Sequence, residues 1–331
     1  MSRVLVSGYG TVREQSLSLY EFCSGKPVKK CWNVEANQPS FLAVDQDVCF
    51  SVEETEGSAA LVSGRFSEKG YTPMDRIEIE GGLLCHITYS TKHHVLYGAC
   101  YETGHVIAVQ VENGFFRKIL HHFILGEEPG KISRAHCCLL GPNEDWLYIT
   151  NIALDRIYCY RLTEGGEMLP AEIPYTQLPS GIGPRHLAWH PNGNLLLITE
   201  YSSEILVFRP DFTNGSLNLL QACSALPDQY KQRSDGSSIA VAQDGWIYAA
   251  NRGANTIAAF FTDMQGVLHK KWDFPCAGHW PRHIALSKDG QYLFSANQHS
   301  GEIAVFGRSA DGGLMQVQQI PFAQASFVQD L

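Results

Sequence analysis

One stretch of sequence recurs along the chain, and this repetition restricts the fold more than any other feature. The clearest copies run from Gly183 to Phe208 and from Trp280 to Phe306, and further copies begin near Ser40, Cys85, His136 and Ser237. Each copy contains three apolar runs separated by polar turns, which is the pattern of an antiparallel β-meander. The period of about 45 to 52 residues is typical of a four-stranded propeller blade.

The two ends of the chain together supply a seventh copy. Residues 3–10 and 17–22 resemble the second and third strands of a copy, and residues 323–329 resemble the missing first strand. Closing a ring with strands from both ends removes exposed sheet edges. We therefore expect an all-β fold, a seven-bladed β-propeller of four-stranded antiparallel blades, with the N- and C-terminal strands in one blade.

The domain organisation follows from the same repetition. A chain of 331 residues exceeds the usual single-domain size, but no linker, charge block or change of composition marks a boundary. The repeats instead predict a single propeller domain over residues 1–331. Such a protein is expected to be a monomer or a weak homo-oligomer.

Charge and hydropathy exclude several classes of partner. The formal net charge is −9 and no run of Lys and Arg occurs, so binding to nucleic acid is not expected. No window approaches the ~20 apolar residues of a membrane span. Met1 leads directly into a strand-like segment without an apolar signal core. We therefore expect a cytoplasmic protein that makes no membrane contact.

The cysteines and histidines do not form a metal-binding pattern. The ten cysteines are scattered, mostly within apolar runs, and no CxxC pair occurs. They are expected to be reduced thiols that behave as small apolar side chains. His93-His94 and His121-His122 lack the spaced partners that a zinc site needs. The sequence thus predicts neither a metal nor another cofactor.

The polar residues of the repeat fall at equivalent places. The first two strands of a blade form a hairpin, so the residue that enters the first strand lies beside the residue that leaves the second. Aligning the turns gives four pairs fifteen residues apart, which are His136/Asn151, Arg185/Glu200, Ser237/Arg252 and Arg282/Asn297. All four pairs are predicted at the same edge of their blades.

These edges should meet, because the first strand of every propeller blade lines the central channel. The mouth of the channel would then hold His136, Arg185, Glu200, Arg252 and Arg282. An acidic protein that gathers arginines in one place favours a carboxylate or phosphate ligand, since the guanidinium group offers forked donors to such anions. Arg–carboxylate pairs also brace neighbouring blades, so any one of these residues could be purely structural.

The same segments resemble the lactonase family of seven-bladed propellers. This family contains cytoplasmic 6-phosphogluconolactonases of one bacterial type and fungal carboxy-cis,cis-muconate cyclases. The resemblance extends over nearly the whole chain. Its carriers are Pro39-Ser-Phe-Leu-Ala-Val44, Gly183-Pro-Arg-His186, Thr199-Glu200, Ala250-Asn-Arg-Gly253, Pro281-Arg-His283 and Ser295-Ala-Asn-Gln298.

The resemblance implies an active site of one His, two Arg and one Glu, which correspond to the catalytic candidates His136, Arg185, Arg252 and Glu200. Glu200 or His136 would act as the general base on water, while the arginines would stabilise the oxyanion. The substrate-binding candidates are Arg282, Asn297, Asn151 and Ser237. Two departures from the family pattern are residues 131–135 before His136 and the pair Cys85 and Cys100.

Three functions from different classes are compatible with these residues. The first is a lactonase that hydrolyses a small anionic sugar lactone, with 6-phosphogluconolactone as the leading substrate. The second is a cycloisomerase of the muconate type, which would use the same groups to close a lactone. The third is a propeller that only binds a partner, since fold alone does not determine function.

Overall fold

A computed structural model of the chain describes residues 2–10, 16–23 and 25–331. The described residues form seven four-stranded sheets and no helix. In six sheets the strand order follows the sequence, as expected of successive meanders. The predicted all-β architecture of four-stranded antiparallel sheets is confirmed. The chain divides into two compact units, which are residues 1–36, 185–209 and 219–331, and residues 37–184 and 210–218.

The first unit contains four sheets, except for Pro184 at the start of one strand and the segment 210–218 that connects two strands. One sheet has the order β28-β1-β2-β3, and the others run β16 to β19, β20 to β23 and β24 to β27. Their strands are β1 (Ser2–Gly8), β2 (Leu17–Phe22), β3 (Lys29–Val34), β16 (Pro184–Trp189), β17 (Leu195–Thr199), β18 (Glu204–Pro210), β19 (Leu217–Ser224), β20 (Asp235–Val241), β21 (Ile247–Arg252), β22 (Thr256–Thr262), β23 (Leu268–Pro275), β24 (Pro281–Leu286), β25 (Tyr292–Asn297), β26 (Glu302–Arg308), β27 (Leu314–Pro321) and β28 (Ala325–Asp330).

The second unit contains the three sheets β4 to β7, β8 to β11 and β12 to β15. Their strands are β4 (Leu42–Asp45), β5 (Val48–Thr55), β6 (Ser58–Ser67), β7 (Gly70–Ile79), β8 (Leu84–Ser90), β9 (Val95–Cys100), β10 (His105–Glu112), β11 (Phe115–Ile124), β12 (Ala135–Leu140), β13 (Trp146–Asn151), β14 (Arg156–Leu162) and β15 (Met168–Gln177).

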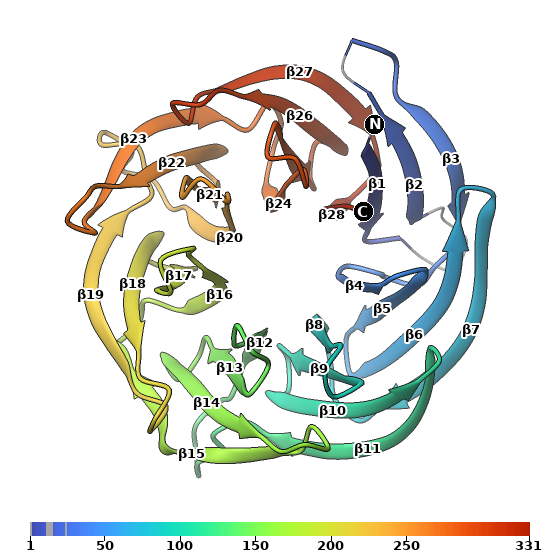
Figure 1. Cartoon of the computed structure of the whole chain (residues 1–331), viewed down its shortest axis with the longest axis vertical. Coiled ribbons are helices and arrows are strands. Elements are labelled where there is room, and N and C mark those ends of the chain that lie inside the picture. Colours follow the sequence, from blue (N-terminus) through green and yellow to red (C-terminus); the bar gives the residue numbers. More distant parts are fainter. Residues whose placement is uncertain (1, 11–15, 24) are drawn as a thin grey trace. The chain divides into compact units, whose positions relative to one another are not determined.

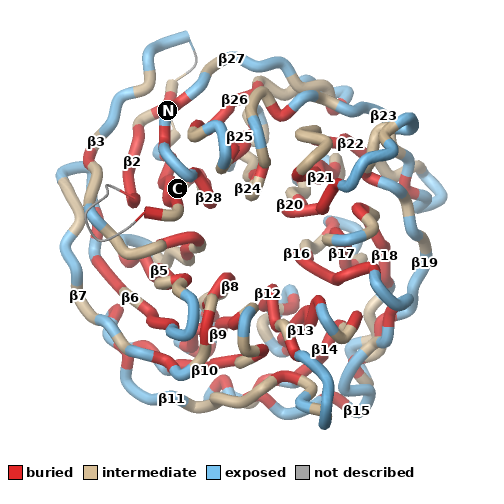
Figure 2. The backbone as a smooth tube through the Cα atoms, turned by 180° about the vertical axis from the view of Figure 1, so that it is seen from behind, coloured by how far each residue is buried: buried red, intermediate tan, exposed pale blue. Residues whose placement is uncertain are grey.

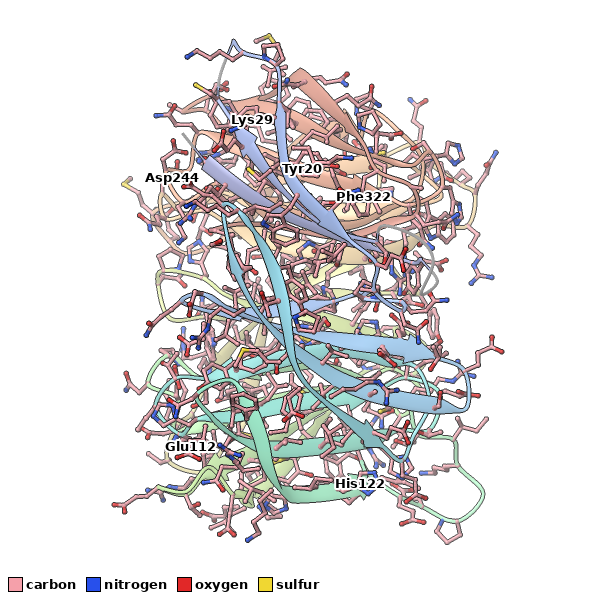
Figure 3. The ribbon with its side chains drawn as sticks, turned by 90° about the vertical axis from the view of Figure 1, so that its right-hand side faces the viewer. Tyr20, Lys29, Glu112, His122, Asp244 and Phe322 are labelled. Carbon is pink, nitrogen blue, oxygen red and sulfur yellow. The ribbon has the colours of Figure 1, made fainter. Side chains whose placement is uncertain are left out.

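The sheet built from both ends of the chain has the predicted composition. Strand β28 pairs antiparallel with β1, with Val6 opposite Val328, and β1 in turn pairs with β2 (Figure 1). Tyr20 and Lys29, labelled in Figure 3, lie on β2 and β3 of the same sheet. The prediction that a C-terminal strand completes the N-terminal copy is therefore confirmed.

The core of each unit lies between neighbouring sheets. In the first unit, Phe294 and Ile303 pack against Val4 and Phe22 of the sheet that contains both ends. In the second unit, Phe50 and Leu61 pack against the sheet of β8 to β11. Each buried side chain of this size contributes roughly 1.5–3 kcal/mol. Figure 2 shows the resulting gradient, with β17 and β21 buried and the fourth strands β19 and β23 largely exposed.

The first strand of several sheets contains a β-bulge near its beginning. Asn297 pairs with Pro281 rather than with Arg282, and Arg252 pairs with Asp235 rather than with Ser237. In the second unit Asn151 likewise pairs with Ala135 instead of His136. The expected register is wrong by one residue at Asn151 and Asn297, because an extra residue is inserted in the first strand. It is wrong by two residues at Arg252, where the connection between β20 and β21 is also one residue shorter. Bulges of this kind redirect side chains and are common beside functional sites.

The structure shows how the thiols and the other possible metal ligands are placed. All ten cysteines are free thiols, and seven of them are buried. Among the described residues, no group of three or more His, Cys, Asp or Glu side chains is arranged to hold a metal ion. In the part of the chain that the structure describes, no helix is long and apolar enough to cross a membrane.

Candidate active site

Glu200 connects two neighbouring sheets of the first unit. It follows β17, and its Oε2 atom accepts hydrogen bonds from Arg185 Nε at 2.8 Å and from Arg252 Nη2 at 3.0 Å. Arg185 lies on β16 of the same sheet, whereas Arg252 ends β21 of the next one. The side chains are 3%, 14% and 7% exposed for Arg185, Glu200 and Arg252. Two nearly buried arginines thus share one carboxylate oxygen.

The close approach of the two sheets depends on Gly236. A Cβ atom at this position would lie 2.2 Å from the carbonyl oxygen of Thr199, so no larger residue fits. The amide of Gly236 donates to the Glu200 carbonyl at 2.8 Å, and its own carbonyl accepts from Arg252 Nη2 at 3.1 Å. The repeat pattern contains no signal for this close approach, so sequence reasoning missed Gly236.

The sheet of β24 to β27 contributes Arg282. The guanidinium group of Arg282 lies 4.8 Å from the ring centre of Tyr9, which follows β1. Ser237 on β20 connects its sheet to both neighbouring sheets. Its hydroxyl donates to the Pro281 carbonyl at 2.5 Å, and its own carbonyl accepts a hydrogen bond from Arg185. We call Arg185, Glu200, Arg252 and Arg282 the arginine cluster.

Electrostatics keep Glu200 ionised. Burial by itself would raise the pKa of this carboxyl group, but the charges of Arg252 and Arg185 and the hydrogen bond from Arg252 outweigh it. Arg282 adds a smaller effect in the same direction, and the net result is a lowered pKa. A carboxylate of this kind is a weak base. Its chemistry fits the positioning of two arginines better than the acceptance of a proton.

A neutral histidine lies beside the cluster. His283 follows Arg282 on β24, its ring stacks on Phe327 at 4.6 Å, and its Nδ1 atom accepts a hydrogen bond from Val328 N at 3.4 Å. Burial, and then the charge of Arg185, lower its pKa to about 3. His283 therefore adds no positive charge to the cluster near neutral pH.

The other predicted residues make local contacts. Asn297 Nδ2 donates to the Cys276 carbonyl at 3.0 Å, which anchors the loop before β24. Asn151 belongs to the second unit, where Nδ2 donates to Ser133 Oγ at 2.7 Å and Oδ1 accepts from two backbone amides. His136, also in the second unit, is buried with its ring 6.1 Å from that of Tyr101. That His136 meets the arginines stays a prediction.

One nitrogen of the Arg252 guanidinium group makes no hydrogen bond to the described residues. Both of its hydrogen bonds involve Nη2. Its Nε atom is buried, and none of the described residues accepts a hydrogen bond from it. A buried donor without an acceptor is costly and is common where a ligand supplies the missing partner. The arrangement can therefore bind an anion or a developing negative charge on oxygen.

A large cavity of the first unit lies away from the cluster. A cavity of about 730 Å³ is lined by His190, Asp244, Trp246, Phe261 and Lys271, with residues of the adjoining turns. His190 follows β16, whereas Arg185 lies at its beginning, so this cavity is at the other end of the strands.

Comparison with known proteins finds one matching family model and several relatives of similar sequence. The family model described as lactonase, 7-bladed beta-propeller, matches residues 3–329. A 6-phosphogluconolactonase of Bacillus subtilis is 26% identical over 287 residues, covering 83% of this chain and 81% of the relative. A 6-phosphogluconolactonase of Erwinia tasmaniensis is 26% identical over 260 residues, covering 76% of this chain and 73% of the relative.

Solved structures share the fold. A protein from Lactobacillus plantarum has a TM-score of 0.92 at 22% identity, with 100% of both chains covered. The periplasmic gluconolactonase of Pseudomonas aeruginosa has a TM-score of 0.92 at 21% identity, covering 100% of this chain and 99% of that one.

Proposed function

Because the chain belongs to the lactonase family of seven-bladed β-propellers, we propose that it hydrolyses a small anionic sugar lactone, with 6-phosphogluconolactone as the first candidate. The names of two relatives support this substrate class. The observation that carries the proposal is the unused Nε donor of Arg252, held beside a carboxylate that orients the guanidinium group.

The arginines would bind the charged parts of the reaction. Arg282 is half-buried and faces an aromatic ring, which suits the anionic substituent of the substrate. Arg252 and Arg185 would stabilise the oxyanion that forms when water attacks the lactone carbonyl. Donors fixed in advance in this way typically contribute about 10²- to 10³-fold to the rate.

The hydrolytic step balances without a metal or another cofactor. Water forms a bond to the carbonyl carbon and gives a proton to a general base, while the carbonyl electrons move to oxygen. The bond to the ring oxygen then breaks, and that oxygen takes up the proton. The product is the open-chain hydroxy acid. Asn297, Asn151 and Ser237 would support binding by fixing the ends of the hairpins.

We assign the general base to His136 and a positioning role to Glu200. The two assignments differ in their consequences for the rate. A general base typically contributes about 10²- to 10⁴-fold, so His136→Ala should lower kcat by a factor in this range. The lowered pKa of Glu200 keeps its carboxylate ionised and paired with the two arginines. An unchanged kcat in His136→Ala contradicts the assignment of His136.

The central experiment measures acid release from 6-phosphogluconolactone above its spontaneous hydrolysis. We expect turnover by the wild type, and a loss of ~100-fold or more in Arg185→Ala. Arg117→Ala is the matched control, since Arg117 is half-exposed on β11, where it pairs with Glu112 and lies over the Phe115 ring. A panel with uncharged and muconate lactones defines the substrate class. No turnover of any lactone would favour a binding protein.

We also propose a cytoplasmic location. Ten free thiols, seven of them buried, suit a reducing compartment. One solved structure with this fold is a periplasmic gluconolactonase, so the fold is not confined to one compartment. Fractionation of cells that express the chain distinguishes the two locations.

A further inference from the structure

The loop between β23 and β24 holds a tryptophan in an unusual conformation. Trp280 has φ = 67° and Ala277 has φ = 56°, both in the left-handed region. A bulky residue seldom adopts this region, and such strain is typical of ligand-binding segments. The neighbours of the loop maintain it, because Trp280 N donates to Asn255 Oδ1 at 2.9 Å and its carbonyl accepts from Gln298 N at 3.0 Å.

The strained backbone places the indole beside Arg252. The guanidinium carbon of Arg252 lies 5.6 Å from the centre of the Trp280 ring. The same indole stacks on the imidazole of His299 at 4.6 Å with an interplanar angle of 15°. Burial, together with the charges of His279, Arg282 and Arg252, lowers the pKa of His299. Trp280 and His299 therefore form a neutral aromatic wall next to the arginine cluster.

Neither aromatic residue is needed to pair the arginines with Glu200. Arg252 reaches Glu200 and the Gly236 carbonyl through Nη2 alone. The ion pairs therefore do not explain the strained backbone of the loop. The loop does supply a flat apolar surface within reach of a cationic group. This combination suits a ligand that has an anionic substituent and a ring with an apolar C–H face.

We propose that Trp280, supported by His299, receives the ring of a phosphorylated sugar while the arginines bind its anionic group. This inference rests on the proposed function and deepens it, since it makes Trp280 the residue that selects cyclic sugar anions over small anions without a ring. Glucose 6-phosphate carries the ring and the phosphate but no lactone bond. It therefore probes the wall without being hydrolysed, and inorganic phosphate is the probe without a ring.

The test measures the binding of both probes by calorimetry to wild type, Trp280→Leu and Trp280→Phe. We expect Trp280→Leu to weaken glucose 6-phosphate by ~10-fold or more and to change phosphate less than ~2-fold. Trp280→Phe should restore most of the affinity for the sugar phosphate, because an aromatic face is retained. Trp272→Phe, on the exposed strand β23, is the matched control and should leave both affinities unchanged.

Folding is checked with Trp280→Gly. Glycine adopts φ = 67° without strain, so this variant should melt within a few degrees of the wild type and still bind glucose 6-phosphate weakly. Equal losses of affinity for both probes in Trp280→Leu would contradict the proposal that Trp280 receives the sugar ring. Unchanged affinities in this variant would also contradict it, as would a wild type that does not bind glucose 6-phosphate. The absence of lactone turnover with Trp280-dependent binding would refute only the proposed hydrolysis.

Discussion

The hairpin ends of the two units, several of which contain a bulge, carry very different side chains. In the first unit they carry Arg185, Glu200, Arg252 and Arg282, which are joined by ion pairs or face aromatic rings. In the second unit, Cys85 occupies the bulge of β8, and its thiol donates to the carbonyls of Ala99 and His136 at 3.5 Å. Neutral groups therefore suffice to satisfy the buried hydrogen-bonding atoms at the end of a hairpin.

The fold requires hydrogen bonds at the hairpin ends, but it does not require charged side chains there. Each hairpin end needs buried hydrogen bonds, and Asn151 provides them without charge. Burying two arginines and a glutamate instead costs several kcal/mol of desolvation per ion, which pairing only partly offsets. Two buried arginines that share one glutamate thus occur in the first unit, whereas the buried Glu54 at the end of β5 in the second unit accepts a hydrogen bond from the Ser40 hydroxyl. This difference favours the arginine cluster of the first unit as the place where a ligand binds.

The largest expected effect is on catalysis. Arg252→Lys keeps the positive charge but removes Nε and the planar fork, so we expect kcat/KM for the lactone to fall ~100-fold or more. Cys85→Ser in the second unit changes one atom at an equivalent bulge and should alter kcat/KM less than ~3-fold. Equal losses in the two variants would show that the units do not differ in function.

The next effect is on stability. Glu200→Gln leaves two buried guanidinium groups without a carboxylate, and we expect the free energy of unfolding to fall by about 3–5 kcal/mol. Urea denaturation measures the change. Ser133→Ala in the second unit removes two neutral hydrogen bonds, one from Asn151 and one to the Leu125 carbonyl, and should cost only about 2 kcal/mol. A smaller loss for Glu200→Gln than for Ser133→Ala contradicts the contrast drawn between the units.

Much of this contrast could be predicted from the sequence. The repeat predicted the four-stranded sheets, and counting from the turns placed Arg185 beside Glu200 and Arg252 near them. The bulges could not be predicted, because they insert one residue without changing the polar pattern of the strand. Gly236 and Trp280 were missed for a related reason. Their roles depend on a close approach between sheets and on a backbone angle, neither of which leaves a periodic signal.

The stability difference should depend on pH. The pKa of Glu200 is lowered in the folded protein, so its stabilising contribution is present above the unfolded value near 4.3 and is lost as the pH falls through the folded value. We expect the gap in unfolding free energy between wild type and Glu200→Gln to be constant from pH 6 to 8. It should narrow below about pH 4. A gap that widens on acidification would contradict an ionised Glu200.

The smallest effect concerns thiol reactivity and again divides the two units. The half-buried cysteines Cys23, Cys31 and Cys223 all lie in the first unit, whereas the six cysteines of the second unit are buried. Burial raises the pKa of Cys49 and of Cys100 to about 12, so little nucleophilic thiolate forms there near neutral pH. Alkylation of the native protein at pH 7.5, followed by peptide mapping, should label only the three half-buried thiols. Rapid labelling of Cys49 or Cys100, with the unfolded protein as the reference for complete reaction, would show that the sheets of the second unit open locally more often than those of the first.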